Sequence, residues 1–189
     1  MAVILLGAFL MIAQPGRYAI PSAAMEPTLH GGDGLAGDRV FTSQWEYRFH
    51  PPQFGDIIVF RAPAIADGEH TDPAEKVENI LIKRIIGVPG DRIEVKPSGR
   101  GKTPDGEPAY AVFRNGAELA EPYIKEPMEP PGPGATHGVN QPLAIGADHY
   151  FVMGDNRNDS NDSRYWGALD RPRILGKVTT ILPSPLRKQ

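Results

Sequence analysis

The sequence contains no cysteine, which excludes disulfide bonds, thiolate catalysis and cysteine-ligated zinc sites. The histidines do not have the spacing of metal ligands, so we expect ordinary surface or turn positions for His30, His50, His70, His137 and His149. The net charge is −3 and the basic residues are scattered, which is not the footprint of a nucleic-acid-binding protein. We therefore predict no metal, no cofactor and no nucleic-acid partner.

The sequence also lacks an uncharged apolar run long enough to span a bilayer. The longest such run, Ala2 to Ala13 (AVILLGAFLMIA), would extend about 18 Å as a helix, against a hydrocarbon core of about 30 Å. Its length fits the apolar region of a secretory signal peptide, but no Lys or Arg precedes it. A buried core helix and the outer half of a transmembrane helix are further interpretations. Gln14-Pro15-Gly16 ends the run.

Glycine and proline are abundant, at 21 and 20 of 189 residues, so we expect many turns and few long helices. Alternating apolar stretches outnumber helical patterns and predict short strands. Asn115-Gly116 is typical of a two-residue hairpin turn. Residues 62–76 and 126–142 are expected to be loops, the second of them extended and mobile. The expected strands are Asp56–Phe60, Ile80–Val88, Arg92–Lys96, Ala109–Arg114, His149–Met153 and Ile174–Leu182. The sequence thus predicts an all-β protein.

Lys83 lies within an apolar run, ILIKRIIGV, with Leu81 and Ile85 on its own face if the run is a strand. An ammonium group in apolar surroundings loses solvation, which lowers its pKa and allows the amine to act as a base. An exposed lysine on a strand face is the ordinary alternative, and the run alone does not distinguish the two.

Residues 153–167 (MGDNRNDSNDSRYWG) are dense in short polar side chains directly after an apolar strand, which is typical of a structured turn. A calcium-binding loop is excluded. With Asp155 as its first position, Ser160 stands where the EF-hand needs Gly and Trp166 where it needs Glu. We expect Tyr165 and Trp166 to pack in the core.

Four segments in the same order resemble the type I signal peptidases, which are membrane-bound Ser/Lys endoproteases. They are PSAAMEPTL (Pro21–Leu29), GDIIVF (Gly55–Phe60), KRIIGVPGD (Lys83–Asp91) and GDNRNDSNDSR (Gly154–Arg164). Each segment alone is a modest signal, whereas four in order are a strong one. The resemblance implies an antiparallel β-sheet catalytic core with a smaller inserted β subdomain, preceded by an apolar, transmembrane-type helix. We expect residues 1–19 to be a membrane anchor or its remnant, 20–95 and 147–189 the catalytic core, and 96–146 the inserted subdomain.

The resemblance also implies residue roles. Lys83 matches the general base, Ser22 the oxyanion donor that assists the backbone amide at position 24, and Ser160 the serine that orients the lysine amine. Met25 and Pro27 match the stretch that shapes the substrate groove. The polar support of the site is matched by Asp155, Arg157, Asp162 and Arg164.

The nucleophilic serine of the family falls on Ala24. A methyl group cannot form an acyl-enzyme, so the sequence predicts a signal peptidase that is inactive as written. Two origins account for Ala24: an experimenter replaced a native serine, or the chain is a natural paralogue that lost the serine. If Pro21–Met25 is extended, Ser22 and Ala24 face the same side, but Ser22 is then about 6.6 Å too far along to replace the nucleophile.

The resemblance further implies signal peptides of exported preproteins and the lipid bilayer as partners. The location implied is the bacterial cytoplasmic membrane, with the catalytic domain on its outer side. A pseudoenzyme that binds exported peptides or a sister peptidase is the alternative. A self-cleaving Ser/Lys repressor is disfavoured, because an apolar segment, not a DNA-binding helical domain, precedes the first segment.

Overall fold

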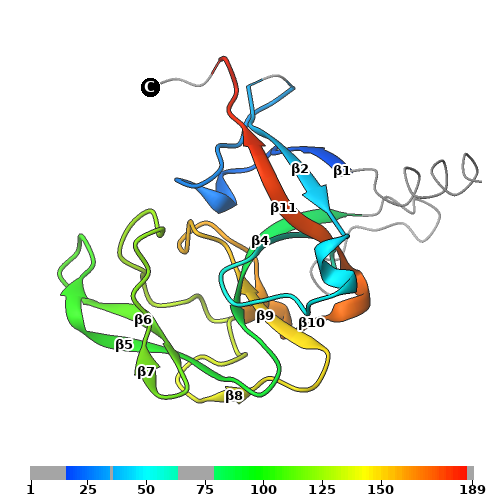
Figure 1. The fold of residues 1–189 in the computed structure, drawn as a ribbon. Coiled ribbons are helices and arrows are strands. Elements are labelled where there is room, and N and C mark those ends of the chain that lie inside the picture. Colours follow the sequence, from blue (N-terminus) through cyan, green and yellow to red (C-terminus); the bar gives the residue numbers. More distant parts are fainter. Residues whose placement is uncertain (1–15, 35, 64–78, 187–189) are drawn as a thin grey trace, which may run out of the picture.

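A computed structural model describes residues 16–34, 36–63 and 79–186 (Figure 1). Within them, eleven strands form two antiparallel sheets. The strands are β1 (Gly16–Ala19), β2 (Arg39–Ser43), β3 (Ile57–Arg61), β4 (Ile80–Gly87), β5 (Arg92–Lys102), β6 (Pro108–Arg114), β7 (Ala117–Glu118), β8 (Leu143–Ala144), β9 (His149–Met153), β10 (Leu169–Asp170) and β11 (Ile174–Leu182).

The larger sheet has seven strands in the order β1-β2-β11-β3-β4-β9-β10. Strands far apart in sequence lie side by side in it, because β11 pairs with both β2 and β3 and β9 pairs with β4. This crossing of the chain brings the segment after β1, the strand β4 and the loop after β9 into one region (Figure 1). The sheet therefore joins the family-like segments that the sequence separates.

The smaller sheet has four strands in the order β7-β6-β5-β8 and is formed by the chain between β4 and β9. Asn115 and Gly116 both have positive φ, 54° and 85°, and close the turn between β6 and β7, which confirms the predicted hairpin. The strand β5 runs to Lys102, beyond the predicted end at Lys96, because its pairing with β6 resumes after an irregularity between Pro97 and Lys102.

The six strands expected from alternation are all present, and apart from the end of β5 their ends lie within one residue of the predicted ends. The prediction missed the short strands β1, β2, β7, β8 and β10, which hold only two to five residues each. Such short pieces carry too few residues for a clear alternating pattern. Most of the expected loop at residues 62–76 lies outside the described residues, and so does the apolar run Ala2–Ala13.

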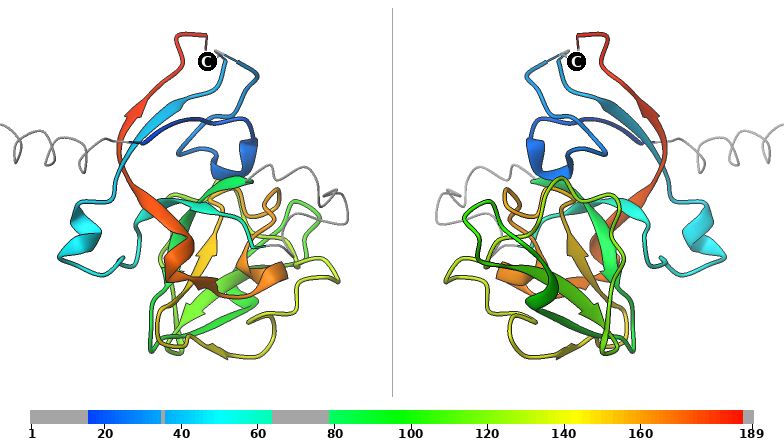
Figure 2. Two further views of the ribbon diagram at one scale, coloured as in Figure 1. Left: turned by 90° about the vertical axis from the view of Figure 1, so that its right-hand side faces the viewer. Right: turned by 90° about the vertical axis from the view of Figure 1, so that its left-hand side faces the viewer.

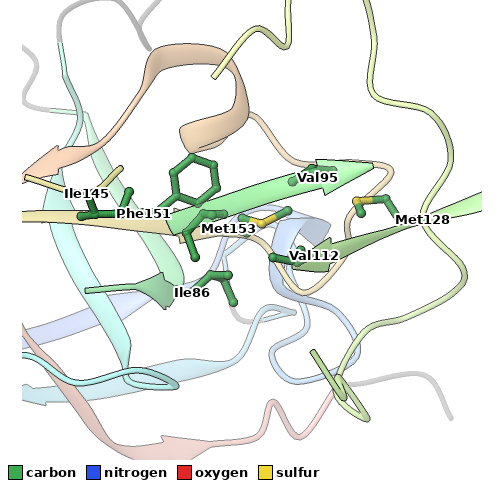
Figure 3. Packing of buried hydrophobic residues seen from close by; sticks show 8 residues of the cluster. Ile86, Val95, Val112, Met128, Ile145, Phe151 and Met153 are labelled. Atoms are coloured by element: carbon green, nitrogen blue, oxygen red, sulfur yellow. The ribbon is translucent and has the colours of Figure 1, made fainter. Parts of the chain in front are cut away.

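The main core lies between the two sheets, as Figure 3 shows. Ile86 of β4 and Phe151 and Met153 of β9 pack against Val95 of β5 and Val112 of β6. Because side chains alternate along β4, its neighbour Ile85 points into a different cluster with Phe60, Tyr150 and Trp166. Trp166 is 7% exposed, which confirms its prediction as a core residue.

Helical structure in the described residues is limited to single turns. They are η1 (Ala23–Met25), η2 (Glu46–Arg48), α2 (Ser163–Trp166) and η4 (Arg171–Arg173). No helix within residues 16–34, 36–63 and 79–186 has the length and apolar character needed to cross a bilayer.

Candidate active site

Ala24 lies on η1, a single 3-10 turn, so Pro21–Met25 is not extended throughout. Ser22, with φ −124° and ψ 160°, is extended, and the chain turns immediately after it. The turn is held from outside: Asn156 donates from its backbone N to Ala24 O at 3.2 Å and from its Nδ2 to Ala23 O at 3.1 Å. The expectation that Ser22 and Ala24 face the same side of a strand therefore does not apply.

Lys83 is buried within β4, where its side chain is 4% exposed. Desolvation by burial lowers the pKa of its amine, while Asp162 partly opposes this shift and Arg164 adds to it. The carboxylates of Asp162, Asp159 and Asp155 stabilise the charged form of the amine, but the effect of burial is larger. An amine of this kind is neutral over a wider pH range than an exposed lysine and can accept a proton.

Gly154 connects Ala24 to the polar loop that follows β9. A Cβ added at Gly154 would collide with Ala24 O and Ser160 Oγ, and it would lie 2.7 Å from Ser160 Cβ. The backbone at position 24 and the Ser160 side chain therefore both pack directly on this residue. Ser160 Oγ is buried and has no hydrogen-bond partner among the described residues. Its hydroxyl is thus available to a group that enters the site.

Asp162 and Arg164 form a buried ion pair beneath this loop, with Arg164 Nε 2.8 Å from Asp162 Oδ1. Burial alone raises the pKa of Asp162, but Arg164, together with Lys83 and the Gly154 N–H, holds it below its ordinary value. Arg164 also donates to Arg157 O at 2.7 Å. The pair fixes the loop through its backbone, because Gly154 N donates to Asp162 Oδ2 at 3.1 Å.

Asp155 joins all three parts of the site. Its carboxylate accepts from Arg84, the residue after Lys83, at 2.8 and 2.6 Å, and from Thr28 Oγ1 at 2.5 Å. The aspartate is fully buried, and the Arg84 guanidinium stacks 4.0 Å from the centre of the Tyr123 ring. The segment after η1, the strand β4 and the polar loop are therefore bound to one carboxylate.

Arg157 ties the loop to the smaller sheet's side of the molecule. Its side chain is fully buried and donates to both oxygens of Glu121, at 2.8 and 2.6 Å, and from Nε to Gly154 O at 3.0 Å. Glu121 is itself only 6% exposed. Glu121, from the segment after β7, thus holds the Arg157 side chain, which in turn donates to the Gly154 carbonyl beside Ala24.

The two residues predicted to shape a substrate groove have different surroundings. Met25 is fully buried and packs with Ile20, Leu29 and Val40, whereas Pro27 is exposed. Ser22 is also exposed, and its hydroxyl makes no capping bond to η1. Ser22 and Pro27 therefore lie at the surface on either side of the Ala24 turn.

The structure brings together the sequence-predicted residues on η1, β4 and the polar loop. Sequence reasoning missed Arg84, Asn156, Thr28 and Glu121. The first three lie inside or beside the recognised segments, so their position was a usable signal. Glu121 lies 36 residues from Arg157 in a segment without any motif, and only the fold reveals it. In the described residues no group of His, Asp and Glu is arranged to hold a metal ion.

Comparisons with known proteins show which family the chain resembles. The family described as "Signal peptidase, peptidase S26" matches residues 1–182. A probable signal peptidase I-1 from Synechocystis sp. is 40% identical over 166 residues, covering 87% of this chain and 68% of the relative. A probable signal peptidase I-2 from the same organism is 37% identical, covering 86% of this chain and 60% of the relative.

Among solved structures, a crystal structure of a signal peptidase I from Enterococcus faecalis V583 is similar to this chain, with 27% identity and a TM-score of 0.46. The match covers 69% of this chain and 98% of the other. The chain thus spans 68% and 60% of the two Synechocystis relatives, and nearly all of the crystallised chain.

Proposed function

Because the chain belongs to the S26 family of signal peptidases, we propose that its fold is built for cleaving N-terminal signal peptides from exported preproteins by a Ser/Lys mechanism. We further propose that the chain as written is inactive, since Ala24 occupies the position of the nucleophile. The observation that carries the proposal is the buried Lys83, whose pKa is lowered by desolvation and which lies on the strand that contacts η1.

Each predicted residue then has a defined role. A hydroxyl at position 24 would pass its proton to Lys83 Nζ while its oxygen attacks the carbonyl carbon of the scissile bond. The resulting oxyanion would be held by the backbone N–H at position 24 and the Ser22 hydroxyl, a type of contact worth about 10²–10³-fold in rate. Lys83 would then return the proton to the leaving amine. Ser160 Oγ, buried and without a partner among the described residues, would orient the lysine amine.

The free edge of β4 supports a binding mode for the substrate. β4 pairs with β3 from Ile80 to Arg84, but with β9 only from Arg84 to Gly87. In the described residues no strand occupies the second edge of Ile80–Lys83. An extended peptide with small side chains at the first and third positions before the cut can add there as a strand, which brings its scissile bond to Lys83.

We assign supporting roles to the residues around the site. Four charged residues hold the polar loop in place: Asp155, Arg157, Asp162 and Arg164. Met25 and Pro27 shape the substrate groove, Met25 from the core beneath it and Pro27 at the surface. We propose the apolar run within the expected segment 1–19 as a membrane anchor or its remnant, with the domain on the outer side of a bacterial cytoplasmic membrane. The end of that segment, Gly16–Ala19, instead forms β1 of the larger sheet. The division into a core of 20–95 and 147–189 and an inserted subdomain of 96–146 stays a prediction.

The decisive experiment introduces the missing hydroxyl. Ala24→Ser should cleave a signal-peptide substrate in detergent, whereas the chain as written should not. In the same background, Lys83→Arg should abolish turnover although it keeps the charge, because a guanidinium with a pKa above about 12 does not accept the proton. The rate of Ala24→Ser should rise with pH as the Lys83 amine deprotonates.

A pseudoenzyme that binds exported peptides or a sister peptidase is the second candidate, and Ala24 itself favours it. It predicts that Ala24→Ser stays inactive while it remains folded and still binds a signal peptide. Cleavage by Ala24→Ser together with full activity of its Lys83→Arg variant would instead remove Lys83 from the mechanism.

A further inference from the structure

A loop of the smaller sheet, residues 119–128, begins and ends on the same strand. Leu119 N donates to Val112 O at 2.8 Å. At the other end, Tyr110 N donates to Met128 O at 2.7 Å. Val112 and Tyr110 are two positions apart on β6, so the two ends of the loop are held close together. The loop is therefore fixed in the smaller sheet, outside the candidate active site.

Tyr123, in the middle of this loop, contacts β4. The Arg84 guanidinium lies 4.0 Å from the centre of the Tyr123 ring. A cation is attracted to the negative face of an aromatic ring, which favours one placement of the guanidinium. Arg84 directly follows Lys83 and binds Asp155 of the polar loop, so its placement affects both segments.

The hydroxyl of Tyr123 reaches a second support of the polar loop. It donates to Glu121 Oε1 at 2.8 Å, and Glu121 forms the buried ion pair with Arg157. Burial, together with the charge of Glu121, raises the pKa of Tyr123, so the hydroxyl keeps its proton and remains a donor. One tyrosine side chain thus touches a member of two ion pairs that hold the polar loop.

Lys125 brings the loop to the segment after η1. Its backbone N donates to Asp155 O at 3.3 Å, and its Nζ lies 2.8 Å from Glu26 Oε2. Glu26 directly follows η1, on which Ala24 lies. Figure 2 shows η1, in blue, above the loop after β9, in orange, with yellow-green chain beside that loop. Residues 119–128 therefore contact all three segments that form the site.

We propose that Tyr123 and Lys125 are positioning residues that set the placement of position 24 relative to Lys83. Their effect on catalysis rests on the proposed function, whereas their effect on the contact between the polar loop and η1 does not. Proton transfer from a hydroxyl at position 24 to Lys83 needs the two groups at hydrogen-bond distance. A displacement of a reacting group by about 1 Å can cost about a hundredfold in rate. A loop fixed at both ends in another sheet holds that distance against local motion.

Turnover in the Ala24→Ser background gives the first test. Tyr123→Leu should lower kcat by about 10–100-fold and change KM little, because it removes the ring beneath Arg84 and the hydrogen bond to Glu121. Tyr123→Phe keeps the ring and should lower kcat by about fivefold, which corresponds to one hydrogen bond.

Tyr110→Leu is the matched control for Tyr123→Leu. Both tyrosines are partly buried and pack against the same core cluster. In the described residues, the Tyr110 side chain forms no hydrogen bond or cation–π contact with the site. Tyr110→Leu should therefore lower stability in urea, as Tyr123→Leu does, but leave kcat unchanged.

Exchange of two charges tests Lys125 where folding is not at risk, because its side chain is 42% exposed. Lys125→Glu places a second carboxylate beside Glu26 and should slow turnover of Ala24→Ser by up to about fivefold. Glu26→Lys added to Lys125→Glu rebuilds the pair with reversed charges and should restore the rate.

Hydrogen exchange at the Asn156 amide needs no cleavage. This N–H donates to Ala24 O at 3.2 Å and therefore reports whether the polar loop stays on η1. In the chain as written, Tyr123→Leu should speed this exchange about tenfold through local opening, after correction for the change in global stability. Tyr110→Leu should leave the corrected exchange rate unchanged.

Equal effects of Tyr123→Leu and Tyr110→Leu on kcat and on Asn156 exchange would overturn the inference and make Tyr123 an ordinary core residue. If Ala24→Ser does not cleave, the proposed function fails and the exchange measurement decides alone. Faster exchange in Tyr123→Leu only would then support the inference, and equal exchange would overturn it. If Tyr123→Leu does not fold, the charge exchange decides, and a rate that the reversed pair does not restore overturns the inference.

Discussion

At the scale of single residues, Lys83 shows how burial sets chemistry. Its side chain is 4% exposed, and desolvation lowers the pKa of its amine. The neighbouring Arg84 leaves β4 on the other face and binds Asp155 at 2.6 Å. The two adjacent cations differ because side chains alternate along a strand: Lys83 is buried on one face, whereas Arg84 forms an ion pair with Asp155 on the other.

The lowered pKa of Lys83 has a consequence for stability. Between the folded pKa and the unfolded value of about 10.4, the unfolded chain binds more protons at this lysine, so stability rises with pH across that window. Lys83→Met should therefore raise the free energy of unfolding at pH 7 by about 1–3 kcal/mol, since it removes a buried polar group whose largest electrostatic effect is desolvation. The gain should shrink as the pH approaches 10.

Urea unfolding at a series of pH values measures this gain. Lys102→Met, at an exposed position of β5, controls for the loss of a lysine and should change stability little. A gain from Lys83→Met that is the same at every pH, or no gain at pH 7, would contradict the assignment of a desolvated amine.

At the scale of elements, the site is an assembly of η1, β4 and the loop after β9, held by contacts between them. The loop approaches η1 so closely that only a glycine fits at position 154. Asp155 fixes Arg84 and Thr28 from the same loop. Each of these contacts joins residues distant in sequence, so the geometry of the site depends on the packing of elements more than on any one motif.

Gly154→Ala tests the close approach of the loop to η1. The added methyl group would overlap Ala24 O and Ser160 Oγ, so backbone must shift, and we expect a loss of about 1–3 kcal/mol in unfolding free energy. In the Ala24→Ser background the same change should remove activity, because position 24 moves. Gly99→Ala is the control, since a methyl group there meets open space. Equal stability of the two variants would show that the loop and η1 are not in tight contact.

Glu121→Gln tests the buried charge that supports the loop from outside. It leaves Arg157, whose side chain is fully buried, without its counter-ion, which should cost about 3–5 kcal/mol in thermal or urea unfolding. Glu94→Gln breaks the partly exposed pair with Lys96 and should cost at most about 1 kcal/mol. A cost for Glu121→Gln as small as that for Glu94→Gln would mean that Arg157 finds another partner or solvent.

At the scale of the whole molecule, two sheets share a core and the site lies on the larger one. The chain enters this sheet at β1, beside the η2 turn with its exposed aromatic side chains. The apolar run Ala2–Ala13 precedes that entry by a few residues. Attachment to a membrane would therefore act on the sheet that carries Lys83 and contacts η1, on which Ala24 lies.

Deletion of Met1–Ala13 should increase solubility and reduce partition into liposomes, because it removes the longest uncharged apolar run of the chain. Flotation with liposomes measures the partition. Unchanged partition after the deletion would assign the run to the protein core.

The sequence by itself determined the β class, the six longer strands, the Asn115-Gly116 hairpin and the family. It could do so because alternation, turn residues and short motifs act over a few neighbouring positions. Only the tertiary structure decided that Ala24 sits on a 3-10 turn, that Met25 is buried and that Lys83 is desolvated. It alone revealed Glu121 behind Arg157. These features depend on which distant elements pack together, and burial and charge pairing are properties of that packing.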